Sequence, residues 1–179
     1  MKLKNVMTPV VAIIAAALLL AAASFGLSSV QQSYEAKALD IMLHNLLIGS
    51  GEFVEEEYTG EDANIRKVYK SDIGYVIETA TNGYVDEITM MVGVSNDGAV
   101  TGLVVKELSE TYGLGANALN DIQFLHRFLN TTGDAEIGTN VDAISGATVT
   151  SKAVTRCVNS AVAFVTGADV SSSATSWGG

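Results

Sequence analysis

Residues 74–107 read GYVIETATNGYVDEITMMVGVSNDGAVTGLVVKE, and this stretch decides the fold. Apolar and polar or small residues alternate along it, most clearly over 87–95, a pattern typical of strands with one face buried. The pairs Asn82-Gly83 and Asp97-Gly98 are typical of tight hairpin turns. With a further strand at 65–70, the sequence predicts strands at 74–81, 87–95 and 99–107. Such short connections join antiparallel neighbours, so we expect an antiparallel meander.

Two helices are expected after the strands. Over 121–130 the residues Ile122, Leu125, Phe128 and Leu129 share one helical face, and Asn120 or Asp121 can cap it. The second helix has the clearest periodicity, over four turns, and Thr150 or Ser151 can cap it. Its apolar positions are Val149, Ala153, Val154, Cys157, Val158, Ala161, Val162 and Val165. The predicted fold class is α+β, with an antiparallel sheet and helices packed on it.

An apolar segment opens the chain. Residues 10–27 carry no charge over 18 positions, about the length of a membrane-spanning helix, and Lys2 and Lys4 precede them. The positive-inside rule then places the N-terminus in the cytoplasm and the rest of the chain outside. A cleaved signal peptide is the alternative, because Ala21-Ala22-Ala23 resembles a small-residue cleavage site. Both interpretations place the domain on the extracytoplasmic side.

The remaining boundaries follow from helical spacing and composition. Residues 1–29 are expected to form a cytoplasmic tip and transmembrane anchor, and residues 30–51 a stalk helix that ends near Gly49 and Gly51. The domain proper spans 52–166, and its first part, 52–64, is predicted to be an acidic loop. Residues 167–179 are rich in Ser, Thr, Ala and Gly and predict a flexible tail.

Composition narrows the classes of function. The net charge is −10, from 20 acidic and 10 basic residues, which disfavours nucleic acid as a partner. Cys157 is the single cysteine, so neither an internal disulfide nor a cysteine-ligated iron–sulfur cluster is possible within one chain. It lies on the apolar stripe of the last helix and is expected to be a core residue. His44 and His126 lie on different predicted helices, so no metal site is expected.

One segment carries candidate chemistry, and it ends where the last helix begins. It reads Asp142-Ala143-Ile144-Ser145-Gly146-Ala147-Thr148-Val149-Thr150-Ser151. Small residues at 145–147 let another group approach the backbone, and the free N–H groups of a helix start favour a phosphate. An ordinary capped helix start, with a hydroxyl of Thr148, Thr150 or Ser151 as the cap, is the alternative interpretation. Lys152 and Arg156, one turn apart, either approach that phosphate or are solvated; for Arg156 we favour solvation.

Asp142-x-x-Ser145-Gly146-Ala147-Thr148 resembles the flavinylation motif of bacterial FMN-binding domains. These domains occur in the G subunit of the Rnf electron-transport complex and in the C subunit of the sodium-pumping NADH:quinone reductase. The resemblance implies that FMN is joined to Thr148 through a phosphodiester bond, installed by a magnesium-dependent flavin transferase with FAD as donor. It also implies a cofactor-binding role for Ser145, Gly146, Ala147, Val149 and Thr150.

A second stretch supports the same resemblance. Glu110-Thr111-Tyr112-Gly113-Leu114-Gly115 is similar to the Glu-Thr-Pro-Gly-Leu-Gly loop beside the flavin in Rnf G subunits, with Tyr112 in place of proline. The resemblance therefore assigns Glu110, Thr111, Gly113, Leu114 and Gly115 to the flavin site. These glycines also fit part of a dinucleotide fingerprint, but the required βαβ context is missing, so a nicotinamide site is rejected.

The expected function is that of a membrane-anchored electron-transfer subunit with covalent FMN. By resemblance it acts in an Rnf-type complex that couples ferredoxin:NAD electron transfer to ion translocation. Its partners would be the other membrane subunits and the flavin transferase, and the chain would not be catalytic alone. A stand-alone extracytoplasmic flavin carrier and a non-redox binding module are the alternatives.

Overall fold

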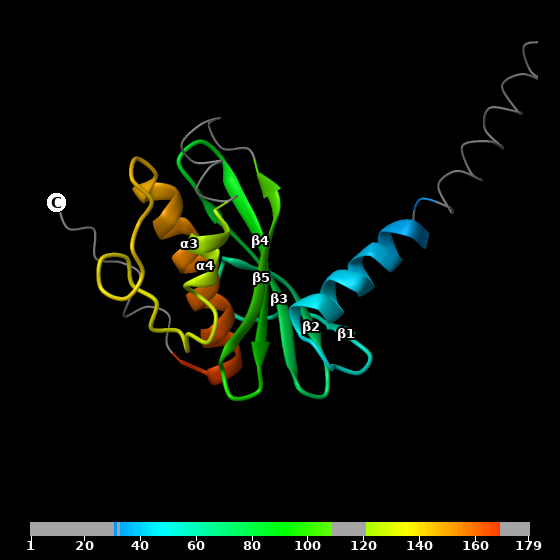
Figure 1. Cartoon of the computed structure of the whole chain (residues 1–179). Coiled ribbons are helices and arrows are strands. Elements are labelled where there is room, and N and C mark those ends of the chain that lie inside the picture. The colour runs from blue at the N-terminus through cyan, green and yellow to red at the C-terminus, as the bar shows by residue number, and fades with distance from the viewer. Residues whose placement is uncertain (1–30, 32, 109–120, 169–179) are drawn as a thin grey trace, which may run out of the picture. The chain divides into compact units, whose positions relative to one another are not determined.

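A computed structural model describes residues 31, 33–108 and 121–168. A five-stranded antiparallel sheet, in the order β1-β2-β3-β4-β5, forms the centre of the domain (Figure 1). Its strands are β1 (Val54–Glu56), β2 (Ile65–Lys70), β3 (Gly74–Asn82), β4 (Glu87–Ser95) and β5 (Val100–Leu108), and helices α3 (Ile122–His126) and α4 (Thr148–Thr166) follow. The predicted α+β class with an antiparallel meander is confirmed.

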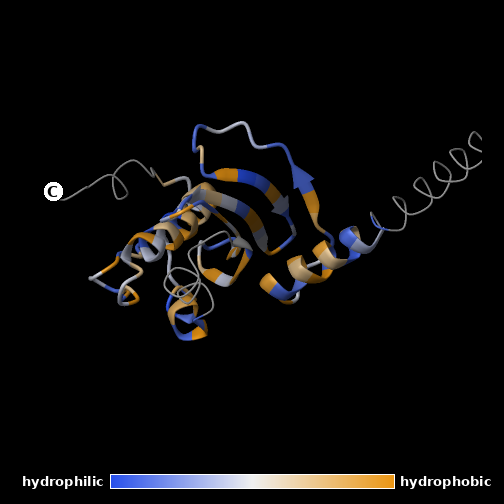
Figure 2. Cartoon of the chain, turned by 90° about the horizontal axis from the view of Figure 1, so that it is seen from above, coloured by the Kyte–Doolittle hydropathy of each residue, from blue (hydrophilic) through white to orange (hydrophobic). Residues whose placement is uncertain are grey.

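The central hairpin is regular because the alternation in its sequence matches the two faces of a sheet. Strands β3 and β4 pair without interruption from Gly74 opposite Ser95 to Asn82 opposite Glu87. Alternate residues of β4 point into the core against α4 and are fully buried, namely Ile88, Met90, Val92 and Val94. Figure 2 shows the alternation as bands of hydrophobic and hydrophilic colour along the strands. The predicted bounds of this hairpin were correct to within one residue.

The prediction of a loop over 52–64 was wrong at one place. Residues 54–56 form the edge strand β1, which pairs with β2 from Val54 opposite Lys70 to Glu56 opposite Val68. All three residues of β1 are exposed, so the strand has no apolar alternation to reveal it. Cross-strand charge pairs support it instead, with Lys70 Nζ 3.2 Å from a Glu56 carboxylate oxygen and Lys67 Nζ 3.7 Å from one of Glu55.

Helix α4 covers one face of the sheet, and its predicted apolar stripe is buried from Ala153 to Val162. The first position of that stripe, Val149, is instead 43% exposed. Helix α3 is shorter than predicted but begins as expected, since the Asp121 carboxylate accepts hydrogen bonds from the backbone N–H groups of Gln123 and Phe124. Its buried residue is Phe124 rather than Ile122, which is 76% exposed.

The opposite face of the sheet is contacted by the segment that leads into the domain. Residues 33–46 are helical, as the stalk prediction expects, and the turn after them includes Gly49 with φ 86°. Leu43, Leu46 and Leu47 are buried. A Cβ atom on Gly93 would lie 2.5 Å from the Leu46 carbonyl oxygen, so this close approach requires glycine. The described residues up to 41 belong to a separate compact unit.

Several predictions concern residues outside the described ranges. They are the transmembrane anchor at 1–29, the loop Glu110–Gly115 and nearly all of the tail at 167–179. Within the ranges that the structure describes, no helix has both the length and the apolar character needed to span a membrane.

Candidate functional site

The motif segment is a loop that is anchored at both ends and exposed in the middle. Val141 and Ala147 are buried, with 1% and 4% of their surface exposed. Between them, Ser145 and Gly146 form an exposed turn in which Gly146 has φ 80°. This left-handed conformation favours glycine, so Gly146 is required by the backbone itself as well as by any close approach of a ligand.

Helix α4 begins at Thr148 without a side-chain cap. Its N-cap residue is Ala147, which offers no side-chain hydrogen bond. The predicted caps were therefore wrong, because Thr150 and Ser151 point into the protein and are 1% and 0% exposed. The Ser151 hydroxyl donates to the Ala147 carbonyl oxygen at 2.9 Å and accepts from the Ile144 backbone N–H at 3.2 Å, so it braces the loop instead.

An uncapped helix start of this kind fits an anionic group. The first-turn N–H groups of a helix carry partial positive charge, and a phosphate is stabilised by both the donors and the helix dipole. Thr148 is exposed at this position, as is Val149 beside it. Since the other hydroxyls of the first turn are buried, Thr148 is the accessible one in that turn, and Ser145 is the accessible one in the loop before it.

A surface ion pair connects the motif to the region after α3. Arg127 Nη1 donates to Asp142 Oδ2 at 2.7 Å, and the two side chains are 43% and 86% exposed. An exposed pair of this kind contributes about 0–1 kcal/mol to stability because solvent screens it. It joins the first residue of the motif to the residue that follows α3.

Arg156 lies where helix α4 meets strand β3, and the expectation of a solvated side chain was wrong. Arg156 is only partly exposed, and its Nη2 donates to the Asn82 carbonyl oxygen at 3.4 Å. Its Nε is buried with no hydrogen-bond partner among the described residues. Lys152, one turn earlier, is exposed. A guanidinium with an unused buried donor therefore lies two turns from the start of α4.

Cys157 is buried in the core, as its position on the apolar stripe predicted. Burial raises the pKa of its thiol to about 11, although the neighbouring Thr79 hydroxyl acts in the opposite direction. The thiol is therefore protonated at neutral pH and unreactive. The two histidines lie on separate elements, with His44 packed edge-on against Phe53 at a ring distance of 5.2 Å and His126 exposed.

The structure thus brings together the predicted residues Ser145, Gly146, Ala147, Thr148 and Val149 around the start of α4, with Thr150 buried just behind them. Sequence reasoning predicted the β3–β4 hairpin but missed the contact that joins its strand β3 to helix α4, between Asn82 and Arg156. Those residues are 74 positions apart, and no local pattern in the sequence indicates such a contact.

The site is the start of a helix that covers the sheet and follows an exposed, uncapped Ser-Gly-Ala-Thr loop, and comparison with known families adds a class of protein. Residues 83–163 match the family described as FMN-binding domain. The matched range begins in the β3–β4 turn and contains β4, β5, α3, the motif and most of α4.

Relatives of this chain include G subunits of ion-translocating oxidoreductase complexes. The chain is 39% identical over 100 residues to the G subunit of the Na⁺-translocating ferredoxin:NAD⁺ oxidoreductase complex of Acetobacterium woodii, covering 50% of this chain and 48% of that protein. It is 40% identical over 101 residues to the G subunit of the proton-translocating ferredoxin:NAD⁺ oxidoreductase complex of Clostridium ljungdahlii, covering 52% of this chain and 54% of that protein. Each alignment spans about half of the relative's length.

A third relative is the G subunit of the ion-translocating oxidoreductase complex of Methanosarcina acetivorans. It is 39% identical over 98 residues, with 52% of each chain covered. Among solved structures, Shewanella oneidensis NqrC is similar with a TM-score of 0.45 and 21% identity, covering 64% of this chain and 70% of that one.

Proposed function

We propose that this chain is a membrane-anchored electron-transfer subunit that carries one FMN covalently on Thr148 and works in an Rnf-type complex. The observation that carries the proposal is the accessible Thr148 hydroxyl at an uncapped helix start, inside a segment that matches the FMN-binding domain family. When bound, FMN supplies the redox chemistry. The protein supplies position, electrostatics and exclusion of competing groups.

The residues of the loop have distinct tasks in this proposal. The first-turn amides of α4 hold the phosphate, and the exposed turn at Ser145 and Gly146 leaves room for it and for the flavin transferase. Ser151 keeps the loop against the helix through its two hydrogen bonds. Thr150 is buried, so it supports the helix start from behind rather than contacting the flavin.

Attachment uses FAD as donor and leaves the flavin's redox state unchanged. The Thr148 hydroxyl oxygen forms a bond to the flavin-side phosphorus of FAD, and the bond from that phosphorus to the bridging oxygen of AMP breaks. The hydroxyl proton is lost and AMP leaves. Exposure of Thr148 is a requirement of this step, because a second protein must bring the donor to the hydroxyl.

The proposed setting draws on the relatives. Their complexes transfer electrons between ferredoxin and NAD⁺ and translocate ions, so we assign this chain to a complex of that type with other membrane subunits as partners. Residues 10–27 would anchor the chain in the cytoplasmic membrane, with the domain on the extracytoplasmic side, because Lys2 and Lys4 precede the apolar segment.

The attachment is tested by co-expressing the full chain with an active flavin transferase. The wild type should give a fluorescent band that survives denaturing electrophoresis, and Thr148→Ala should give none. Thr139→Ala is the matched control, since it removes an exposed hydroxyl that lies outside the motif and should load normally. Thr148→Ser keeps a hydroxyl and should load partially. A wild-type chain without covalent flavin under these conditions would show that the proposed function is wrong.

The setting is tested separately. A reporter fused after Gly179 should be active outside the cytoplasm, and the flavin-loaded chain should copurify with integral membrane subunits after mild detergent extraction. Recovery of the chain as a soluble protein cleaved near Ala23 would contradict the anchor. A membrane-bound, flavin-loaded chain that copurifies with no other protein would indicate a stand-alone carrier.

A further inference from the structure

The end of the domain opposite the start of α4 is formed by three loops that hydrogen bonds hold together. They are the segment 47–53, the β2–β3 turn and the β4–β5 turn. The Asp72 carboxylate accepts from the Gly51 backbone N–H at 2.8 Å, and the Asn96 side-chain amide donates to the Asp72 carbonyl oxygen at 3.0 Å. The Asn96 backbone N–H also donates to the Ile73 carbonyl oxygen at 3.1 Å. These bonds fix the three loops relative to one another.

The last turn of helix α4 lies at the same end (Figure 1). The Phe164 and Tyr75 rings are 5.6 Å apart, and a Cβ atom on Gly98 would lie 2.5 Å from the methyl carbon of Thr166. Helix α4 has 19 residues, so about 28 Å separate this end from Thr148. A molecule bound at this end therefore has no need to contact Thr148.

The loops at this end expose aliphatic side chains that the fold does not bury. Ile48 is 84% exposed, Val54 63% and Ile73 38%. A single exposed aliphatic residue is ordinary, but three of them on connected loops of a small domain indicate an interaction surface. Because the hydrogen bonds already hold these loops in place, little conformational entropy is lost when a partner binds them.

The same loops carry negative charge that no cation neutralises. Glu52, Asp72 and Asp97 are exposed, and none of them forms an ion pair with another described residue. The Gly51 N–H hydrogen bond lowers the pKa of Asp72, and the Ser95 hydroxyl lowers the pKa of Asp97. Both carboxyl groups are therefore ionised at neutral pH.

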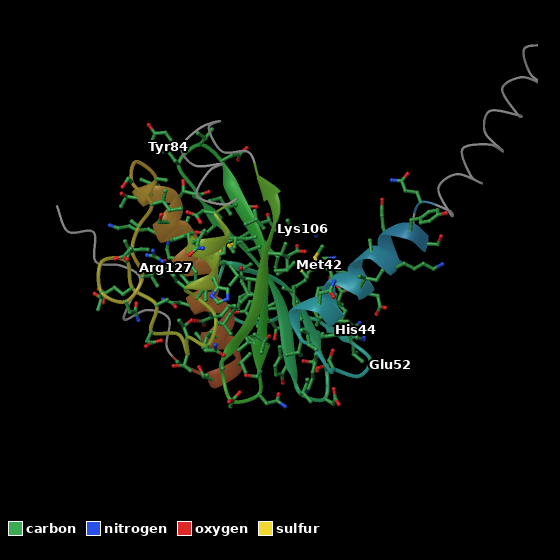
Figure 3. The ribbon with its side chains drawn as sticks, in the orientation of Figure 1. Met42, His44, Glu52, Tyr84, Lys106 and Arg127 are labelled. Carbon is green, nitrogen blue, oxygen red and sulfur yellow. The ribbon has the colours of Figure 1, made fainter. Side chains whose placement is uncertain are left out.

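Helix α4 adds to this negative potential. The C-terminal end of a helix dipole is negative, and the last turn of α4 contains no basic residue. Lys70, the cation at the end of β2, is already paired with Glu56 at 3.2 Å. Figure 3 shows Glu52 on the loop that leads into β1. Exposed aliphatic side chains at this end are thus accompanied by unpaired acids.

We propose that this end of the domain is a docking surface for a positively charged partner protein. The surface consists of three aliphatic and three acidic residues, namely Ile48, Val54, Ile73, Glu52, Asp72 and Asp97.

Charge complementarity selects this occupant. A second copy of the chain would bring the same acids face to face, and an anionic lipid surface would be repelled in the same way. A protein that presents aliphatic side chains among Lys or Arg residues matches both features of the surface. Because the surface is remote from Thr148, docking is independent of flavin attachment.

The docking surface is tested by photocrosslinking the full chain in the cells that make it. A photoreactive benzophenone amino acid at position 73 should give a cross-link to another protein, and mass spectrometry identifies the peptide of that protein that is joined. This peptide should contain aliphatic residues together with Lys or Arg. The same amino acid at position 122, where α3 also exposes an isoleucine, is the matched control and should not give this cross-link.

Two further substitutions separate the charged from the apolar contribution to docking. Glu52→Lys should lower the yield of the cross-link from position 73 several-fold at low salt, and added salt should lower the yield of the unsubstituted surface because exposed charges are screened. Glu61→Lys makes the same change of charge on the β1–β2 loop and should leave the yield unchanged. Ile48→Ser should lower the yield at low and high salt alike.

The outcomes separate this inference from the proposed function. Thr148→Ala should lose the covalent flavin and keep the cross-link, so each proposal can fail without the other. No cross-link from position 73, or a cross-link only to a second copy of the chain or to lipid, overturns the docking surface. A partner peptide without Lys or Arg, or equal yields in Glu52→Lys and Glu61→Lys, overturns the charge complementarity on which the choice of partner rests.

Discussion

The two ends of helix α4 are built in opposite ways. At its C-terminal end, Phe164 makes edge-to-face contacts with Tyr58 and Tyr75 at ring distances of 5.8 and 5.6 Å. Gly167 closes the helix in the left-handed conformation, and its N–H donates to the Ala163 carbonyl oxygen at 2.8 Å. Aromatic contacts and a glycine cap of this kind are common at stable helix ends.

At the N-terminal end, the same helix starts without a side-chain cap, after an exposed turn. The closed end contributes stability, whereas the proposed function requires the hydroxyl and amide groups of the open end to be available to a ligand. Backbone N–H groups at one end of a helix can remain without hydrogen-bond partners when the packing of the rest of the helix keeps it rigid. This difference between the two ends predicts that stability and flavin loading can be changed separately.

The largest loss of stability is expected at the closed end. Phe164→Ala removes a partly buried ring and both of its aromatic contacts, so the free energy of unfolding should fall by about 2–3 kcal/mol. Urea titration measures it, and the folded fraction should still accept flavin. A loss equal to that of an exposed-site control such as Ile122→Ala would show that the aromatic cluster does not hold this end.

A smaller loss is expected at the turn of the motif. Gly146 has φ 80°, so Gly146→Val should cost about 1–2 kcal/mol through backbone strain and should also block loading. Gly146→Asn tolerates this conformation and should recover most of the stability. Equal destabilisation by valine and asparagine would contradict the strain argument, and full loading of the valine variant would show that the flavin transferase needs no space there.

Loss of the Ser151 hydrogen bonds between the motif loop and helix α4 is expected to lower the free energy of unfolding by a still smaller amount. Ser151→Ala removes the acceptor of the Ile144 N–H and should cost about 1 kcal/mol. Thr166→Ala at the closed end also removes a hydroxyl bonded to the preceding turn, but from an exposed residue, and should change stability by less than about 0.5 kcal/mol. Thermal unfolding of the pair measures the difference, and equal values would contradict the role of Ser151.

The sequence allowed the sheet to be predicted because its strands alternate and are joined by two recognisable turns. The long apolar stripe of α4 allowed that helix to be predicted in the same way. Strand β1 was missed because its three residues are exposed and are stabilised by charges on β2. The caps of α4 were assigned incorrectly because a hydroxyl at 150 or 151 has the same local pattern whether it points to the helix end or into the core.

The candidate site was predictable only in its local part. The motif from Asp142 to Thr148 is contiguous, so its residues could be identified by resemblance and by their position before a helix. The contact of Arg156 with Asn82 depends on the packing of α4 against β3, which no short stretch of sequence encodes. The same is true of Gly93, whose need for a small side chain arises from the Leu46 carbonyl lying above it.

The central claim is that the open end of α4 carries the flavin at one atom, the Thr148 hydroxyl oxygen. Tandem mass spectrometry of the tryptic peptide 128–152 from flavin-loaded protein tests it most directly, because that peptide contains every hydroxyl of the motif. We expect one added FMN less one water, localised to Thr148, and no change in unfolding free energy beyond about 0.5 kcal/mol in Thr148→Ala. Covalent flavin localised to another residue, or persisting in Thr148→Ala, would contradict it.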